Sequence, residues 1–146
     1  MDFLLEVPHD FFTARWHELR TDLVRFTGDR ALVLFAHAIS DANNNLVCAA
    51  LFRRELLEHG EDPDRPQDDE ALQVLIDWGR LIATDPGGIS PEFYTALATR
   101  YNQQIRVPLL EFAGQVIAAN VFTAVAQVPL DESLYPYRKP GDERTR

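Results

Sequence analysis

Cysteine is almost absent from this chain, and metal-binding patterns are missing altogether. Cys48 stands alone, so no intramolecular disulfide can form, and one cysteine cannot build a zinc site. No two of the four histidines have metal-ligand spacing. The acidic run at residues 61–69 lacks the turn glycine and the closing glutamate of a calcium loop. We therefore expect no bound metal, and no phosphate-cradling glycine loop or other motif indicates a cofactor.

Basic residues are also scarce. The 14 Lys and Arg against 23 Asp and Glu give a net charge of −9, which opposes binding to nucleic acid or to an anionic membrane. The N-terminus lacks the basic and apolar regions of a signal peptide, and no apolar run approaches the roughly 20 residues that cross a bilayer. These absences predict a cytoplasmic protein without nucleic-acid or membrane partners.

What the sequence does contain is a set of amphipathic or wholly apolar helical segments. Phe12, Trp16, Leu19, Leu23 and Phe26 follow one another at steps of three and four, which places them on one stripe of a first helix ending at Thr27-Gly28. Residues 29–40 are almost wholly apolar, so we expect a central second helix there. A strand of similar composition is the alternative, and the alanines and helical neighbours of the segment favour the helix.

Further helices are predicted from their start and stop signals. A third follows the polar stretch 40–45 and stops at Gly60, a fourth covers 69–83, and a fifth begins at Ser90-Pro91 and ends near Gln103. A sixth is expected at 107–127 with Pro108 in its first turn. The fold class is all-α, a bundle of about six helices forming one domain at residues 1–137, with a polar tail at 138–146. The chain after Pro129 is expected to be irregular.

Two side chains are candidates for catalysis. Cys48 lies in the first turns of the third helix, where the helix dipole would stabilise a thiolate, although a buried cysteine acting as a small hydrophobe fits the same position. His37 precedes Asp41 by one helical turn, and such a pair could transfer protons. The alternative is that His37 is a hydrogen-bonded core residue.

Several polar residues lie on otherwise buried helices. Trp78 and Arg80 belong to the segment Asp77-Trp78-Gly79-Arg80, and Asn120 lies on the sixth helix. Asp77 and Arg80 can form an ion pair, and Asn120 can form a hydrogen bond across a helix contact. We interpret them as structural, with Trp78 and Arg80, together with Asn45 of the polar stretch 40–45, kept as candidates for lining a binding pocket.

Taken together, these segments resemble the alkylhydroperoxidase D-like and carboxymuconolactone decarboxylase superfamily. The resemblance covers about residues 8–137 and rests on AHAISDANNNLVCAALF at 36–52, IDWGRLIATDP at 76–86 and the run from Leu110 to Glu132. It implies an alkylhydroperoxidase D-like helical fold, assembly into a homo-oligomer, and a buried interface formed by the apolar second and sixth helices.

The resemblance also implies roles for individual residues. Cys48 matches the peroxide-attacking cysteine of the peroxidase branch, but Asn45 stands where its resolving cysteine belongs, Phe52 where its histidine belongs and Val33 where its glutamate belongs. A sulfenate at Cys48 would therefore need an outside thiol to reduce it. This predicts a diverged member whose thiol peroxidase or oxidoreductase activity is weak or lost.

Two other functions stay open. The first is a lactone-decarboxylase type of small-molecule enzyme that does not depend on Cys48, with His37, Trp78 or Arg80 lining its pocket and Arg30 as a further cation. The second is a non-catalytic, homo-oligomeric binding protein, in which the thiol is inert and the pocket lacks convergent polar groups.

Overall fold

The computed structural model describes residues 9–65 and 67–146, and all their regular secondary structure is helical. No strand occurs among these residues, so the expected all-α fold class is confirmed. The described helices are α2 (His9–Thr27), α3 (Asp29–Ala42), α4 (Leu46–Glu58), α5 (Glu70–Thr84), α6 (Pro91–Arg100), α7 (Gln103–Val125) and the 3-10 helix η1 (Glu132–Tyr137).

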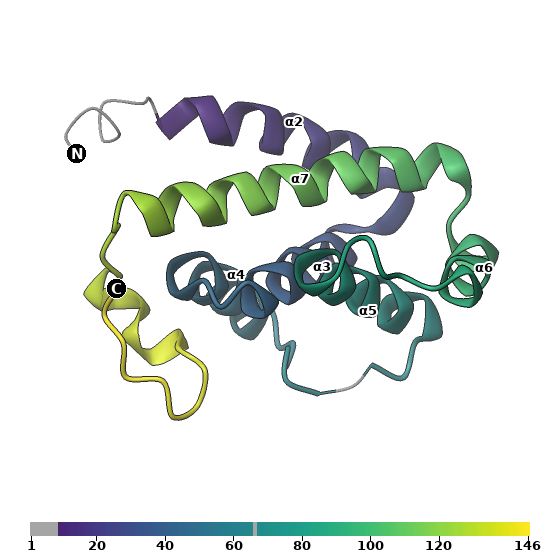
Figure 1. Cartoon of the computed structure of the whole chain (residues 1–146). Coiled ribbons are helices and arrows are strands. Elements are labelled where there is room, and N and C mark those ends of the chain that lie inside the picture. The colour runs from purple at the N-terminus through teal and green to yellow at the C-terminus, as the bar shows by residue number, and fades with distance from the viewer. Residues whose placement is uncertain (1–8, 66) are drawn as a thin grey trace.

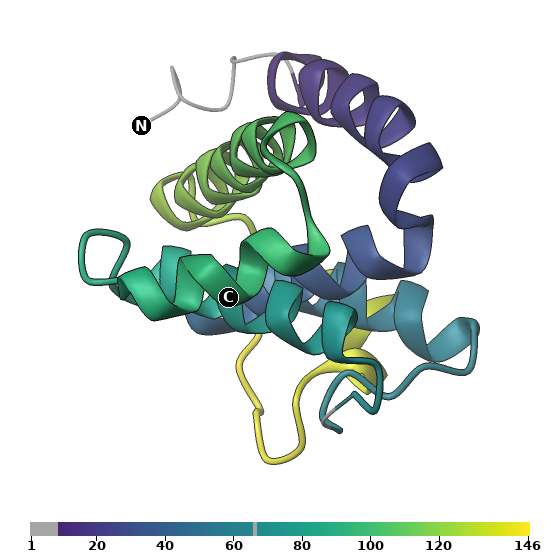
Figure 2. The same ribbon diagram turned by 90° about the vertical axis from the view of Figure 1, so that its right-hand side faces the viewer.

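The helices form two layers. Helices α2 and α7 run alongside each other in one layer, and α3, α4 and α5 make up the other (Figures 1 and 2). Helix α3 is central, because it contacts α2, α4, α5 and α7. Its residues from Ala31 to Ser40 are all buried, as expected for a segment with almost no polar side chains.

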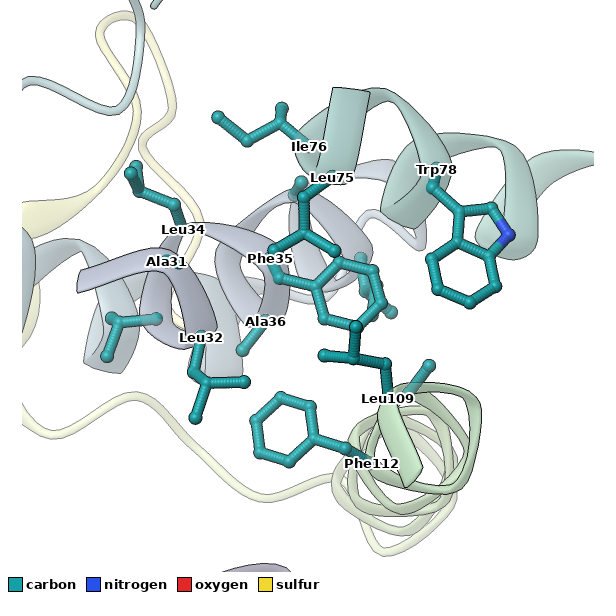
Figure 3. Packing of buried hydrophobic residues seen from close by; sticks show 14 of the residues in the cluster. Ala31, Leu32, Leu34, Phe35, Ala36, Leu75, Ile76, Trp78, Leu109 and Phe112 are labelled. Carbon is teal, nitrogen blue, oxygen red and sulfur yellow. The ribbon is translucent and has the colours of Figure 1, made fainter. Parts of the chain in front are cut away.

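Stacked aromatic rings join the two layers. Phe35 of α3 is fully buried, and its ring centroid lies 5.8 Å from that of Trp78 on α5 and 6.2 Å from that of Phe112 on α7. Figure 3 shows Phe35 reaching from α3 toward Leu109 and Phe112. Helices α3 and α5 approach closely at Gly79, where an added Cβ would lie 3.0 Å from a Phe35 ring carbon.

Most predicted helix starts carry the expected side-chain caps. Asn45, Asp69 and Ser90 each accept a hydrogen bond from a backbone amide in the first turn of their helix, and Pro91 takes the first helical position of α6. Gly28 separates α2 from α3 with a φ of 80°, which is a conformation that favours glycine. Local capping chemistry therefore located these boundaries correctly.

The boundary between α6 and α7 differs from the prediction. Helix α6 ends at Arg100 and α7 begins at Gln103, so Pro108 lies inside α7 and not in its first turn. The reason is Asn102, whose side-chain oxygen accepts a hydrogen bond from the Ile105 amide and starts the helix earlier. Pro108 has no N–H to donate to the carbonyl four residues before it, and the helix continues nonetheless.

The expected buried stripe of α2 is wrong in part. Phe26, the last member of the predicted buried stripe of α2, is 60% exposed, whereas Leu19 and Leu23 are buried. Phe26 lies at the end of α2, next to its last residue Thr27. The Phe12 side chain and residues 1–8 lie outside the part of the chain that the structure describes.

The segment after Pro129 is more ordered than expected. The Asp131 side chain accepts a hydrogen bond from the Ser133 amide at 2.9 Å and caps η1, which packs on α4. Leu134 is buried there together with Leu130. The tail then returns toward the loop between α3 and α4, where Arg144 donates to the side-chain oxygen of Asn44 at 3.1 Å.

Helix α7 is long and apolar enough to cross a membrane, judged by length and composition only. Over its best 18 residues the mean hydropathy is 1.4, and 28% of that window is buried. The expectation that no segment approaches this length therefore does not hold for α7. That expectation applied to unbroken apolar runs, and α7 has a few polar side chains among its apolar ones.

Candidate functional site

A groove with a volume of about 640 Å³ lies between α2, α4 and α7. We call it the Cys48 groove, after the one cysteine in its wall. Its apolar lining consists of Trp16, Val47, Cys48, Leu51, Phe52, Val116, Ala119, Phe122 and Val128. Its polar lining consists of His17, Arg20, Arg54, Glu55, Glu58, Gln115 and Thr123. The groove is thus an apolar cleft with polar groups at its edges.

The α2 edge of this groove is closed by an ion-pair network. Arg20 donates to both carboxylate oxygens of Asp29 at 2.7 Å and also pairs with Glu55. Its guanidinium carbon lies 5.3 Å from the centroid of the Trp16 ring. Because hydrogen bonds to these carboxylates raise the Arg20 pKa above its ordinary value, Arg20 stays charged and holds α2, α3 and α4 together.

The Cys48 thiol is held in its neutral form. Cys48 is only 8% exposed, and burial raises its pKa to about 11, although a weak hydrogen bond with Thr123 acts in the opposite direction. The two atoms of that contact, Cys48 Sγ and Thr123 Oγ1, are 4.0 Å apart. Desolvation therefore outweighs the effect of the Thr123 hydrogen bond. This geometry favours the interpretation of Cys48 as a small buried hydrophobe.

The Asn45 side chain forms hydrogen bonds that join α4 to α7. Its Oδ1 accepts from the Cys48 amide at 2.9 Å, and its Nδ2 donates to the Asn120 carbonyl at 2.9 Å and to Thr123 Oγ1 at 2.8 Å. It thereby caps α4 and fastens that helix to α7. Both Nδ2 donors of Asn45 are used in these contacts, and its Oδ1 accepts the capping hydrogen bond.

Asn120 belongs to the same buried network. Its Oδ1 accepts from the Ser40 hydroxyl at 3.1 Å, and its Nδ2 donates to Asn43 Oδ1 at 2.9 Å. Asn120 thus connects α7 to the end of α3, as expected for a hydrogen bond across a helix contact. Because buried amides are costly without partners, this network fixes the register of α7 against the α3–α4 turn.

His37 faces α4 and not the Cys48 groove. Its Nε2 lies 3.5 Å from Nη1 of Arg53, which is itself 4% exposed and pairs with Asp64 of the acidic loop. Burial lowers the His37 pKa to about 4, which keeps the ring neutral at physiological pH. Asp41 contributes an opposing electrostatic effect, but its carboxylate pairs with Lys139 at 3.4 Å. His37 therefore occupies a buried hydrogen-bonding position.

The other candidates for a decarboxylase pocket are not brought together. Trp78 is buried against Phe35, and its indole nitrogen has no hydrogen-bond partner among the described residues. Arg80 is exposed and lies 3.9 Å from Asp77, the ion pair that the sequence suggested. None of His37, Trp78 and Arg80 lines the Cys48 groove. Arg30 pairs with Glu61 on the surface.

Sequence reasoning missed the residues that shape the groove. Trp16 and Phe52 lie 6.0 Å apart between ring centroids and come from α2 and α4, and Gln115 comes from α7. The sequence predicts that Trp16 belongs to the apolar stripe of α2. Nothing in the sequence indicates that a groove remains between this stripe and α4. The described residues contain no group of three His, Cys, Asp or Glu side chains placed to hold a metal.

Comparisons with protein-family models, with curated proteins and with solved structures found no match to this chain.

Proposed function

We propose that this chain is a diverged member of the alkylhydroperoxidase D-like and carboxymuconolactone decarboxylase superfamily that has lost thiol peroxidase activity. It acts instead as a homo-oligomeric binding protein, and the Cys48 groove takes an uncharged, apolar small molecule. The helical bundle is consistent with that fold type. The observation that carries the proposal is the combination of an apolar groove with a desolvated thiol in its wall.

The groove has the size and chemistry of a small-molecule site. Its 640 Å³ falls within the roughly 300–1,000 Å³ typical of ligand pockets, which are mostly apolar with a few polar groups that set orientation. Aromatic rings of Trp16 and Phe52 lie on two of its walls. The charged side chains of its lining are two cations, Arg20 and Arg54, and two anions, Glu55 and Glu58, so their formal charges cancel, which favours an uncharged ligand.

The surroundings of Cys48 do not support peroxide reduction. A thiol with a pKa of about 11 is almost wholly protonated at neutral pH, and the thiolate is the form that attacks peroxide. The neighbour one turn along α4 is Phe52, which offers no proton acceptor. With Asn45 committed to capping, neither a base nor a resolving thiol is provided at this position.

The ligand-binding part of the proposal is tested with the tryptophan in the groove as reporter. Trp78→Phe leaves Trp16 as the sole tryptophan, so a neutral apolar probe such as N-phenyl-1-naphthylamine should quench or shift its fluorescence saturably. Ala119→Phe fills the groove and should weaken probe binding by at least about tenfold. Ala124→Phe adds the same side chain to an exposed site of α7 and should leave binding unchanged. Equal binding by all three proteins would refute the groove as the site.

The loss of peroxidase activity is tested separately. Wild-type protein and Cys48→Ala should show the same background reduction of hydroperoxide in the presence of a low-molecular-weight thiol. Alkylation of native Cys48 by iodoacetamide should remain slow up to about pH 10 and become fast once the chain is unfolded. Turnover that disappears in Cys48→Ala would restore the peroxidase hypothesis.

A further inference from the structure

The outer face of α7 is an apolar surface that the described chain leaves uncovered. We define it as Val107, Leu110, Gly114, Val121 and Val125, which recur at helical spacing on the side opposite the buried Leu109, Phe112, Ala113 and Val116. Val107 is 62% exposed and Val121 56% exposed. Large apolar side chains gathered on one exposed helix face indicate an interaction surface.

Gly114 in the middle of this face has no role within the described chain. A Cβ added to Gly114 would meet no atom within 4 Å, and its φ is not positive, so neither packing nor backbone conformation requires glycine there. Glycine inside a helix is destabilising relative to alanine. A glycine on an exposed helix face is explained if another helix approaches closely at that point, because small residues let two helix backbones come together.

Charge favours a second copy of the chain as the partner. Two molecules that each carry −9 repel each other over most of their surfaces. Arg106 and Glu111 are the only charged residues of α7, and Glu111 is paired with Arg15 of α2. From residue 112 to residue 125 the helix has no charge at all, so this is the face on which two copies can approach without repulsion.

The spacing of the outer face is self-complementary. Val107 and Val125 lie nine residues before and after position 116, and Leu110 and Val121 lie six before and five after it. An antiparallel pair of α7 helices related by a two-fold axis near residue 116 would therefore place Val107 against Val125. It would also place Gly114 against Ala118, so that the two small residues meet where the helices are closest.

We infer that the outer face of α7 is the contact of a symmetric, antiparallel homodimer of this chain. The inference rests on the homo-oligomeric part of the proposed function and specifies the interface. At 1.5 Å per residue the 23-residue α7 is about 34 Å long, so the helices can pair along their length at the shallow crossing angle of coiled coils. A membrane is a poorer occupant, because surface-lying helices carry many Lys and Arg residues and α7 has only Arg106.

The first experiment measures the molar mass of the full-length chain by light scattering across a concentration series. The mass should rise from 16.6 kDa to twice that value, with dimer predominating at roughly 100 µM. Val121→Glu should raise the dimer dissociation constant by at least about tenfold. The matched control, Leu57→Glu, makes the same kind of change at an exposed apolar residue of α4 and should leave it unchanged.

Circular dichroism establishes that both variants keep their helical content. A wild-type chain that stays monomeric up to about 1 mM would overturn both this inference and the homo-oligomeric part of the proposed function. A wild-type oligomer whose mass is unaffected by Val121→Glu would overturn the α7 interface alone. A mass increase that appears only in the presence of lipid vesicles would identify a membrane as the occupant and would also overturn the inference.

A second experiment tests the antiparallel arrangement in a Cys48→Ala background. Ala118→Cys places two thiols about 6 Å apart along the helix axes, so mild oxidation should form a disulfide-linked dimer. Val107→Cys places them about 27 Å apart, so no such dimer should form. Efficient cross-linking through residue 107 would show a parallel pair and overturn the proposed geometry.

Gly114→Ala provides a third, independent readout. In a monomer the alanine can only favour the helix, so the midpoint of thermal unfolding should rise at low chain concentration. In the dimer the added methyl groups separate the helices, so the dissociation constant should increase by roughly tenfold. An unchanged dissociation constant would mean that no close approach occurs at Gly114.

Discussion

Helices α3 and α7 are similar in composition but differ in how far their apolar side chains are buried. Both are rich in apolar residues with few charges, yet α3 is buried from Ala31 to Ser40, whereas α7 buries one stripe and exposes Val107, Leu110, Val121 and Val125. Both helices contact four others, but the contacts of α3 bury every residue from Ala31 to Ser40, whereas those of α7 bury one side of the helix only. Apolar composition thus identifies a helix that needs covering, but not whether its own chain covers it.

Gly79 of α5 and Gly114 of α7 differ in the same way in the space around them. Gly79 lets α5 approach α3, because a Cβ there would lie 3.0 Å from Phe35 and 3.2 Å from Ile39. Gly114 of α7 has open space around it. The first glycine is explained by contacts within the chain, whereas the described chain offers no such contact for the second, which supports the inferred contact between two α7 helices.

Replacing a side chain of α3 should cost far more stability than replacing one on the outer face of α7. Phe35→Ala removes the ring that lies between Trp78 and Phe112, and we expect the free energy of unfolding to fall by about 3–5 kcal/mol. Leu110→Ala, at a concentration where the chain is monomeric, should change it by less than about 0.5 kcal/mol. Urea denaturation of both variants measures the difference, and similar losses would abolish the contrast between the two helices.

The buried histidine of α3, His37, should make the free energy of unfolding depend on pH. Burial lowers the His37 pKa to about 4, so between pH 6.5 and 4 the unfolded chain binds a proton that the folded chain does not. The free energy of unfolding should therefore fall by up to about 3 kcal/mol as the pH drops from 6.5 to 4.

The matched variant for this prediction is His37→Gln, which keeps a polar group near Arg53 but cannot titrate. Denaturation curves of wild type and variant at several pH values isolate the histidine, because the remaining carboxylates are common to both. If the two proteins lose stability in parallel as the pH falls, His37 is not the buried neutral group that its contacts indicate.

Gly79→Ala should destabilise the chain by about 1–3 kcal/mol through overpacking against Phe35. The alanine favours the helix intrinsically, so the measured loss is the steric cost minus that gain of about 1 kcal/mol. Thermal unfolding followed by circular dichroism provides the measurement. A stabilising Gly79→Ala would mean that α3 and α5 can move apart at little cost.

The smallest effect, and one of opposite sign, is expected for Gly114→Ala. With nothing within 4 Å of the added methyl group, the change should raise the free energy of unfolding of the monomer by up to about 1 kcal/mol. The same thermal measurement at low chain concentration serves both glycine variants. A loss of stability at Gly114 would show that its outer face is not open space in the monomer.

Much of the fold could be predicted from local chemistry. The caps Asn45, Asp69 and Ser90 and the apolar run 29–40 located the starts of three helices and the central helix, because capping and burial periodicity act over a few neighbouring residues. The α6–α7 boundary was misplaced, since the capping side chain of Asn102 was overlooked in favour of Pro108.

The candidate site was less accessible to sequence reasoning. The sequence places Asn45 and Cys48 three residues apart at the start of one helix. Their chemistry, however, depends on groups about 75 residues away in sequence. Thr123 contacts the thiol, and Asn120 and Thr123 accept the hydrogen bonds of Asn45. His37 was paired with Asp41 on its own helix, whereas its polar neighbour is Arg53 of α4.

The sequence by itself determined the helical class, most of the helix starts and which segments must be buried or covered. These properties follow from backbone hydrogen bonding and side-chain periodicity within short windows. The tertiary structure alone decided the state of Cys48, the separation of His37, Trp78 and Arg80, and the exposure of the outer face of α7. Desolvation and packing depend on which distant helices meet, and that arrangement is set by the whole chain.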